Sequence, residues 1–286
     1  MTERERTTMV PFPSDAIIPE RDLGTRPVLD ARHLGVEFGG LKAVDDFNMI
    51  IGRTEIAGLI GPNGAGKTTI FNLITKVYQP TTGTILIDGK DTAGMNTIQV
   101  NKAGIARTFQ NIRLFTDMSV LDNVKVGMHN DIKCSFPESV LHLPGYYKAE
   151  KRANEKAMEL LDFMGLREFA SAKAGSLPYG VQRRLEIVRA LATNPSVILL
   201  DEPAAGMNPS ETAELMHQIR RIRDTFHVAI FLIEHDMNLV MNVCEAIAVV
   251  NYGRIIAKGT PEEIRTNPAV IEAYLGKEEG AANAEG

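Results

Sequence analysis

A glycine-rich octapeptide, GPNGAGKT from Gly61 to Thr68, narrows the folds open to this 286-residue chain more than any other segment. It fits the spacing G-x-x-x-x-G-K-[ST] and lies between the apolar run 56–60 and the helical pattern TTIFNLITKV. Glycines let the backbone wrap closely around a phosphate, so that loop N–H groups and the helix N-terminus point at negative charge. The segment therefore predicts a nucleotide-phosphate site in which Lys67 reaches the β- and γ-phosphates and the Thr68 hydroxyl binds Mg²⁺.

Short apolar β-type segments alternate with helical patterns over most of the chain. The expected strands are VLDARHL, TILIDG and the apolar runs 56–60, 197–200, 228–233 and 247–250. Besides TTIFNLITKV, the helical patterns are VQRRLEIVRALAT, ETAELMHQIRRIRDTF and EEIRTNPAVIEAYL, the last interrupted by Pro268. Continuous apolar runs are typical of parallel strands buried on both faces. The alternation therefore predicts an α/β fold built on a layered sheet.

One stretch, from about Asn111 to Gly175, breaks this alternation. Within it, AEKRANEKAMELLDFMGL places apolar residues on a single helical stripe, namely Ala149, Ala153, Ala157, Leu160, Leu161 and Met164. A helical insertion into the α/β core is the simplest interpretation. The two ends mix charged and small residues without periodicity and are predicted to be mobile extensions.

The overall charge gives no general attraction to nucleic acids. Lys and Arg number 31 against 36 Asp and Glu, which makes a net charge of -5. Binding of a nucleic-acid backbone would therefore need a local basic patch. We interpret the pairs Arg183–Arg184 and Arg220–Arg221 as solvated helix faces rather than as such patches.

The N-terminus and the cysteines indicate a cytoplasmic protein. MTERERTTMVPFPSD has charges and prolines where a signal peptide needs an apolar core, and no apolar run of about 18 residues occurs. Cys134 and Cys244 are far apart and have no Cys-x-x-Cys spacing. We therefore expect two reduced thiols and neither a disulfide framework nor a zinc site.

Acidic residues and a histidine follow two of the expected buried strands. Asp201 and Glu202 end VILLDEP, where Asp201 would hold Mg²⁺ directly or through water and Glu202 would polarise the attacking water. His235 follows VAIFLI, in the sequence IEHD. Because carboxyl ends of parallel strands meet at one edge, it should face the same crevice and hydrogen-bond the γ-phosphate and the water. A purely structural role for His235, or a solvated Asp–Glu pair, is the alternative.

Five segments occur in a specific order: GPNGAGKT, RTFQN, LPYGVQRR, VILLDEP and IEHD. This set resembles the ATP-binding subunits of ABC transporters, and the resemblance extends over nearly all of the range 28–276. It implies a P-loop NTPase (RecA-like) parallel sheet core, an N-terminal antiparallel β subdomain and an inserted α-helical subdomain. The implied domains are a nucleotide-binding core at 28–110 and 182–276, the insertion with its signature loop at 111–181, and mobile ends at 1–27 and 277–286.

The resemblance also implies an ATP hydrolase that uses Mg²⁺. Phe38, in EFGG, would stack on adenine, Ala43 would touch the base, and Gln110 would act as a lever that contacts Mg²⁺ and water. The catalytic residues would be Glu202, His235 and Gln110, and the metal ligands Thr68, Gln110 and Asp201. The ATP-binding residues would be Phe38, Ala43, Gly61, Pro62, Asn63, Gly64, Ala65, Gly66, Lys67, Thr68 and Thr69.

LPYGVQRR departs from the family signature LSGGQ, which in this family contacts the γ-phosphate bound by the opposite subunit. Leu177 and Gly180 agree with that pattern, whereas Pro178 replaces the serine, Tyr179 the first glycine and Val181 the glutamine. Proline has neither a hydroxyl nor a backbone N–H, so Gly180 and the start of the following helix are the expected anion binders. The resemblance implies contacts to the partner subunit from Leu177, Tyr179, Gly180 and Asn208.

Finer features resemble the subfamily that powers high-affinity import of branched-chain amino acids: tyrosine before the signature glycine, RTFQNIRLF and GTPEEIRTNPAVIEAYLG. The implied partners are a second ATPase subunit, identical or related, two membrane permease subunits and, indirectly, an extracytoplasmic substrate-binding protein. The implied location is the cytoplasmic face of the membrane. No nucleic acid is expected among the partners. Alternatives are a urea or short-amide importer, a lipopolysaccharide exporter, a non-transport relative acting on DNA or ribosomes, and a small-molecule kinase.

Overall fold

The centre of the molecule is a six-stranded sheet. The computed structural model describes residues 27–130 and 144–274, so most of the two expected extensions and Cys134 lie outside the described residues. The strand order is β10-β9-β3-β8-β7-β6, parallel except for β10. The strands are β3 (Ile56–Ile60), β6 (Ile105–Arg107), β7 (Val197–Asp201), β8 (Ala229–Ile233), β9 (Ala246–Asn251) and β10 (Arg254–Gly259).

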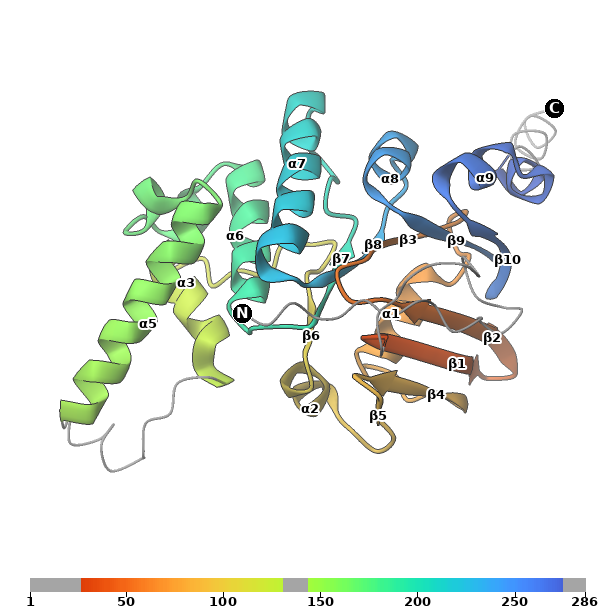
Figure 1. The fold of residues 1–286 in the computed structure, drawn as a ribbon, viewed down its shortest axis with the longest axis horizontal. Helices are drawn as coiled ribbons and strands as arrows, with labels where there is room; N and C mark the ends of the chain where they lie inside the picture. The colour runs from red at the N-terminus through yellow and green to blue at the C-terminus, as the bar shows by residue number, and fades with distance from the viewer. Residues whose placement is uncertain (1–26, 131–143, 275–286) are drawn as a thin grey trace.

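An antiparallel sheet lies beside this core (Figure 1). Its order is β2-β1-β4-β5, formed by β1 (Leu29–Phe38), β2 (Leu41–Ile51), β4 (Thr82–Ile87) and β5 (Lys90–Asp91). Helix α1 (Lys67–Ile74) packs between the two sheets, and its Phe71 ring lies 5.0 Å from that of Phe231 on β8. Buried side chains of the antiparallel sheet, of α1 and of the facing side of the parallel sheet form one apolar cluster.

A second apolar cluster covers the opposite face of the parallel sheet. Successive side chains of a strand point to opposite faces, and Ile198 and Leu200 accordingly join this cluster while Val197 and Leu199 join the first. The helices that contribute to it include α6 (Tyr179–Leu191), α7 (Pro209–Phe226), α8 (Met237–Val243) and α9 (Pro261–Thr266). Short helix α2 (Thr97–Lys102) precedes β6 and buries Val100 in the first cluster.

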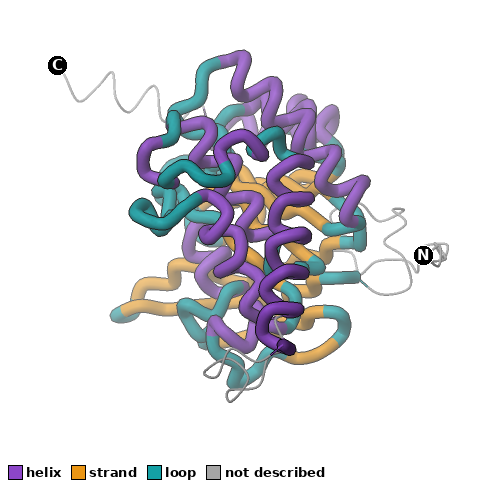
Figure 2. The backbone as a smooth tube through the Cα atoms, turned by 90° about the vertical axis from the view of Figure 1, so that its left-hand side faces the viewer, coloured by secondary structure: helices purple, strands orange, loops and turns teal. Residues whose placement is uncertain are grey.

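A helical region lies at the end of the molecule remote from the antiparallel sheet (Figure 1). It contains α3 (Val120–Gly127), α5 (Pro144–Phe163) and the short 3-10 turns η1 (Met128–Asn130), η2 (Arg167–Phe169) and η3 (Ala174–Ser176). Figure 2 looks onto this end, with helices in front of the strands. Of the predicted apolar stripe, Ala149 is half-buried and the other five residues are buried; all lie on α5 except Met164, which directly follows it.

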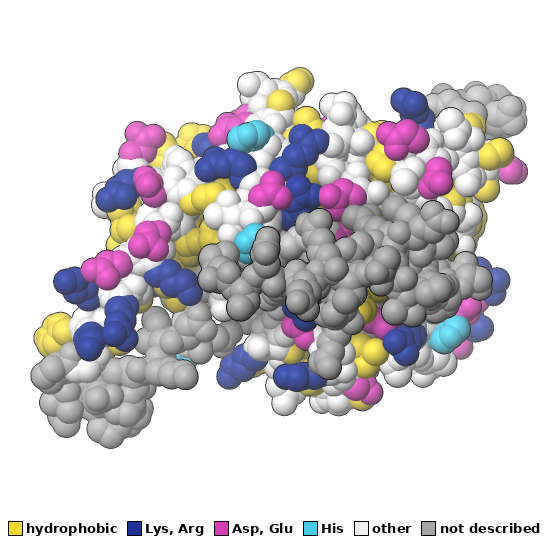
Figure 3. Space-filling view, in the orientation of Figure 1, with side chains coloured by type: hydrophobic (Ala, Val, Ile, Leu, Met, Phe, Trp, Pro, Cys, Tyr) yellow, Lys and Arg dark blue, Asp and Glu magenta, His cyan; other side chains and the backbone are white. Residues whose placement is uncertain are grey.

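The surface carries charges of both signs. On the part of the face that Figure 3 shows uncovered, Lys and Arg are interspersed with Asp and Glu, and Arg184 on α6 pairs with Glu214 on α7 at 3.0 Å. Within residues 27–130 and 144–274, no helix combines the length and the apolar composition needed to cross a bilayer. Within those same residues, Cys244 is buried and forms no disulfide.

Candidate active site

The strand order brings four distant segments to one edge of the parallel sheet. Strands β3, β8, β7 and β6 are neighbours and run in the same direction. The glycine-rich loop follows β3, His235 follows β8, Asp201 and Glu202 lie at the end of β7, and Gln110 follows β6. Crevices at the carboxyl ends of parallel strands are the usual ligand sites of such sheets.

The glycine-rich loop closes around the amine of Lys67. Its Nζ donates to Gly61 O at 2.7 Å and to Pro62 O at 3.0 Å, and the residue is 9% exposed. Gly66 caps α1 with a left-handed φ of 102°, and a Cβ there would lie 2.9 Å from Ala43 O. Glycine is required at this position because both the conformation and the close approach exclude a side chain.

The remaining loop residues differ in accessibility. Asn63, Gly64 and Thr68 are exposed and Thr69 is half-buried, whereas Ala65 is buried. The exposed members lie at or just before the N-terminus of α1, where backbone N–H groups and the helix dipole favour an anion.

A turn that the sequence analysis did not single out supports this loop. Between β9 and β10, Gly253 N donates to Ala65 O at 2.9 Å, and Gly253 O accepts from Asp45 N at 2.9 Å. A Cβ at Gly253 would lie 2.6 Å from Ala43 O. The signal in the sequence is the NYG turn after the last apolar run, which predicts a turn but not its contact with the loop.

Asp201 forms a buried ion pair with Arg107. Its Oδ2 accepts from Arg107 Nη2 at 2.6 Å, and the two side chains are 5% and 6% exposed. Arg107 also donates to Asn72 Oδ1 at 2.8 Å, which joins β6, β7 and α1. A buried carboxylate needs such a partner because desolvation of an isolated charge is costly.

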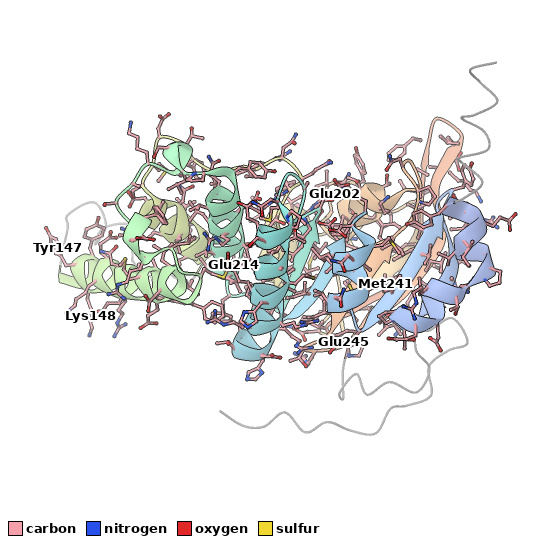
Figure 4. The ribbon with its side chains drawn as sticks, turned by 90° about the horizontal axis from the view of Figure 1, so that it is seen from above. Tyr147, Lys148, Glu202, Glu214, Met241 and Glu245 are labelled. Carbon is pink, nitrogen blue, oxygen red and sulfur yellow. The ribbon has the colours of Figure 1, made fainter. Side chains whose placement is uncertain are left out.

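Gln110, Glu202 and His235 converge at the sheet edge. Gln110 Nε2 donates to Glu202 Oε2 at 2.7 Å, and His235 Nδ1 lies 3.8 Å from that same oxygen. Glu202 has a left-handed φ of 46° and lies near the middle of the molecule (Figure 4), where its N–H donates to Ile233 O at 2.9 Å. The His235 side chain is 63% exposed, so it faces solvent beside the carboxylate.

Glu234, the residue before His235, was missed by the sequence analysis. It is fully buried, and its carboxylate accepts from Ala204 N at 2.8 Å, His235 N at 3.0 Å and Asp236 N at 3.4 Å. Burial raises the pKa of this carboxyl, while the three N–H donors act in the opposite direction. Glu234 thus ties the segment after Glu202 to the loop that carries His235.

The aromatic candidate for base stacking is accessible. Phe38 is 46% exposed at the end of β1, and its ring meets that of Tyr78 edge-on at 5.1 Å. Ala43 is half-buried, and its carbonyl lies against Gly66 and Gly253. Phe38 and Ala43 therefore belong to the antiparallel sheet, and Ala43 lies directly beside the glycine-rich loop.

The residues expected to meet a partner subunit lie together. Leu177 is buried, Pro178 caps α6, and Tyr179 is 45% exposed. A Cβ at Gly180 would lie 2.8 Å from Glu211 Oε1. Asn208 caps α7, because its Oδ1 accepts from Glu211 N at 3.0 Å, so its side-chain amide nitrogen is the group that would donate elsewhere.

The interpretation of Arg183 as part of a solvated helix face is wrong. Its side chain is 0% exposed, whereas that of Arg184 is 22% exposed. Position 183 faces inward because the segments that follow β6 and β7 pack on that side of α6, where the carbonyl oxygens of Phe109, Gln110 and Glu202 accept its hydrogen bonds, beside the carboxylate of Glu186 on α6 itself. The charge pattern of the helix does not reveal this, since three of the acceptors are backbone carbonyls from other segments.

The donor set fits Mg²⁺ better than a transition metal. Among the residues that the structure describes, no cluster of three His, Cys, Asp or Glu side chains could hold a metal. Oxygen donors from Thr68, Asp201 and Gln110 lie on neighbouring segments of the sheet edge. Mg²⁺ prefers a few such oxygens together with substrate phosphates and water.

These features define a P-loop nucleoside triphosphatase: a parallel sheet, a glycine-rich loop before a helix, and acidic residues at the end of a neighbouring strand. Two family matches make the assignment more specific. The ABC transporter family matches residues 44–205, and the branched-chain amino acid ATP-binding cassette transporter family matches residues 254–280. The chain belongs to the ABC transporter family, as an ATP-binding cassette.

Curated relatives agree over nearly the whole chain. It is 45% identical over 253 residues to the high-affinity branched-chain amino acid transport ATP-binding protein BraF of Pseudomonas aeruginosa, covering 88% of this chain and 99% of that protein. It is 46% identical over 253 residues to LivG of Escherichia coli, a protein of the same description, with the same coverage.

Solved structures share the fold. The crystal structure of an ABC transporter's ATP-binding cassette in its ADP conformation matches with a TM-score of 0.76 and 30% identity, covering 88% of this chain and all of that one. A nucleotide-free ATP-binding cassette matches with a TM-score of 0.75 and 31% identity, covering 87% and 98%. The parallel core with an antiparallel β sheet and a helical region is therefore the fold of an ABC ATPase.

Proposed function

We propose that the chain is the ATP-hydrolysing subunit of an importer of branched-chain amino acids. The observation that carries this proposal is the joint match of the ATPase core and of the C-terminal segment 254–280, which includes β10 and α9. The two curated relatives, 45% and 46% identical, are branched-chain amino acid transport proteins by description. In this proposal the chain acts at the cytoplasmic face of the membrane as a peripheral subunit.

The nucleotide site uses the residues already described. Phe38 and Ala43 hold adenine, and the loop 61–69 holds the phosphates, with the Lys67 amine moving from backbone carbonyls to phosphate oxygens. Thr68, Gln110 and Asp201 would hold Mg²⁺, which neutralises charge on the β- and γ-phosphate oxygens when bound. Arg107 donates a hydrogen bond to Oδ2 of Asp201, so the carboxylate is already oriented before a metal ion binds.

Hydrolysis depends on Glu202 as general base. Its Oε2 lies 2.7 Å from Gln110 Nε2 and 3.8 Å from His235 Nδ1. These two side chains would orient a water and support the carboxylate as it accepts the proton. The Gln110 amide can donate to Glu202 through Nε2 while its oxygen remains an acceptor for water or a metal. His235, exposed beside Glu202, would hydrogen-bond the γ-phosphate.

Two ATPase subunits would sandwich two ATP molecules head to tail. Leu177, Tyr179, Gly180 and Asn208 of each chain would meet the ATP held by the other, whether that chain is a second copy or a related subunit. ATP then shifts the equilibrium because it binds more tightly to the closed dimer than to the open one.

The permease contact is assigned to a groove beside Gln110. A cavity of about 500 Å³ is lined by residues of the 109–115 segment, α3 and α6, among them Phe109, Arg113, Phe115, Val126 and Arg189. Phe115 and Val126 are 48% and 41% exposed, although both are apolar. An apolar groove of this kind suits a short helix of a membrane subunit, and its wall continues directly into Gln110.

The test is affinity isolation of the tagged chain from detergent-solubilised membranes, followed by mass spectrometry and by uptake assays in membrane vesicles. We expect two hydrophobic permease chains, a second ATPase, and ATP-dependent uptake of leucine, isoleucine or valine that Lys67→Ala abolishes. Uptake of urea or amides, lipopolysaccharide export, recovery with ribosomes or DNA, or phosphoryl transfer to a small acceptor would each overturn the proposal.

A further inference from the structure

The guanidinium of Arg183 joins the two segments that carry Gln110 and Glu202. Nη1 donates to Phe109 O at 2.5 Å, and Nη2 donates to Gln110 O at 2.9 Å and to Glu202 O at 2.9 Å. The side chain is 0% exposed, so no solvent competes for these bonds. One buried group therefore fixes the backbone carbonyls of both residues whose side chains meet at 2.7 Å.

Glu186, one helical turn further along α6, holds the same segment from its N–H side. Its Oε2 accepts from Arg183 Nη1 at 2.9 Å, and its Oε1 accepts from Arg113 N at 3.2 Å and from Phe109 N at 3.5 Å. Phe109 is thus held through its carbonyl by Arg183 and through its N–H by Glu186. The ion pair therefore forms hydrogen bonds with both ends of the segment 109–113, at Phe109 and at Arg113.

Stability does not account well for this arrangement. A buried ion pair is often no more stabilising than apolar residues of similar size, because two charges must be desolvated. In the described structure, Arg183 Nε is buried without a partner, which adds to that cost. What a guanidinium provides is a planar fork of donors that can hold several carbonyls at fixed angles.

We propose that Arg183 and Glu186 form a positioning pair that sets the Gln110–Glu202 geometry for hydrolysis. The inference rests on the proposed roles of Gln110 and Glu202. Phe109 and Arg113 also line the groove assigned to the permease, so a displacement at Arg113 is transmitted through Glu186 and Arg183 to the Glu202 carbonyl. Arg183 lies one turn after Tyr179, so the same group links the signature loop to both catalytic segments.

The test uses Arg183→Lys and Glu186→Gln in the full-length chain, with Arg184→Lys as the matched control because Arg184 is the adjacent arginine and pairs with Glu214 across the surface. Lysine keeps the charge but lacks the planar fork, so kcat should fall by about tenfold or more while KM for ATP changes by less than about threefold. Arg184→Lys should keep kcat within about twofold of wild type.

Two further measurements separate positioning from loss of stability. In a Gln110→Ala background, Arg183→Lys should lower kcat by a much smaller factor, since the residue it positions is gone. Hydrogen exchange of the N–H groups of Phe109 and Arg113 should be faster in Glu186→Gln, with unchanged exchange in the loop 61–66. This second readout needs no activity and remains informative where an Arg183 variant does not fold.

Wild-type kcat in a folded Arg183→Lys variant, an equal loss of kcat with and without Gln110, or unchanged exchange in Glu186→Gln would each overturn the inference. Failure of the proposed function looks different, because Glu202→Gln would then hydrolyse ATP as fast as wild type. The exchange measurement stands in that case, since it reports the contact itself.

Discussion

Gln110 and Glu202 are joined by a hydrogen bond of 2.7 Å although 92 positions separate them in the sequence. The contact exists because β6 and β7 are parallel neighbours, so the segments that leave their carboxyl ends start side by side. The residue that follows Phe109, which lines the proposed permease groove, thus touches the proposed general base. Any displacement of Gln110 would change the surroundings of that carboxylate directly.

Glu202→Gln should reduce ATP hydrolysis by about 10²- to 10⁴-fold, the usual contribution of a general base, because an amide cannot accept the proton. ATP affinity should be retained, and the closed dimer should accumulate with ATP bound. Phosphate release, equilibrium binding of ATP and gel filtration measure these three quantities. Glu272→Gln, at an exposed site on the C-terminal helical turn, is the control. Equal rates in both variants would remove Glu202 from the mechanism.

Phe38→Ala should weaken ATP binding by about 1–3 kcal/mol, the range found when aromatic rings that stack on bases are removed. Phe38→Tyr should bind as wild type does, because the ring remains. Isothermal titration with ATP gives the affinities, and Leu41→Ala, at a neighbouring residue that is 71% exposed, is the control. If Phe38→Ala binds ATP as tightly as the Leu41→Ala control does, adenine does not stack on Phe38.

Arg107→Ala should lower the free energy of unfolding by about 3–5 kcal/mol, because it leaves the buried carboxylate of Asp201 without its cation. Arg167→Ala removes an ion pair to Asp162 in which both side chains are 62% exposed. Its cost should stay below about 1 kcal/mol. Urea unfolding of both variants measures the difference. Similar losses of unfolding free energy would show that burial does not increase the contribution of the Arg107–Asp201 pair to stability.

Glu234 should make stability fall as the pH rises. Burial raises the pKa of this carboxyl above its ordinary value of 4.5, so the folded chain keeps a proton that the unfolded chain has already lost. Its contribution is complete below pH 4.5 and is lost as the pH rises through the folded-state value. Glu234→Gln cannot ionise, so the free energy of unfolding of wild type should fall relative to that of the variant as the pH rises.

Urea unfolding between pH 4.5 and 8 measures that difference, with Glu272→Gln as the exposed control. A difference that is constant over this range would mean that the folded and unfolded chains release the proton at the same pH.

The sequence predicted the elements whose signal is local. The apolar runs at β3, β7, β8 and β9 and the patterns at α1, α6 and α7 all correspond to elements of the structure. Strands β2, β6 and β10 and helices α2 and α8 were not predicted. β6 has three residues, and β10 lies at the sheet edge with a mixed burial pattern, so neither has a run long enough to stand out.

The same distinction applies to the site. Lys67, Asp201, Glu202 and His235 follow strong strand signals, so their shared edge could be foreseen from topology alone. Arg183, Glu234 and Gly253 act on backbone atoms of remote segments, and no spacing in the sequence reports such contacts. The role of Arg107 could likewise not be predicted from the sequence, because its partner Asp201 lies 94 positions away.

The signature loop rests on the segment that continues from Glu202. A Cβ at Gly206 would lie 3.3 Å from the Tyr179 ring, and one at Gly180 would lie 2.8 Å from Glu211. In the proposed dimer, the surface that each chain offers to its partner's nucleotide therefore packs against the segment that follows its own proposed general base. A shift of one signature loop against its partner's nucleotide would therefore be felt at that chain's own general base through the few residues between Glu202 and Gly206.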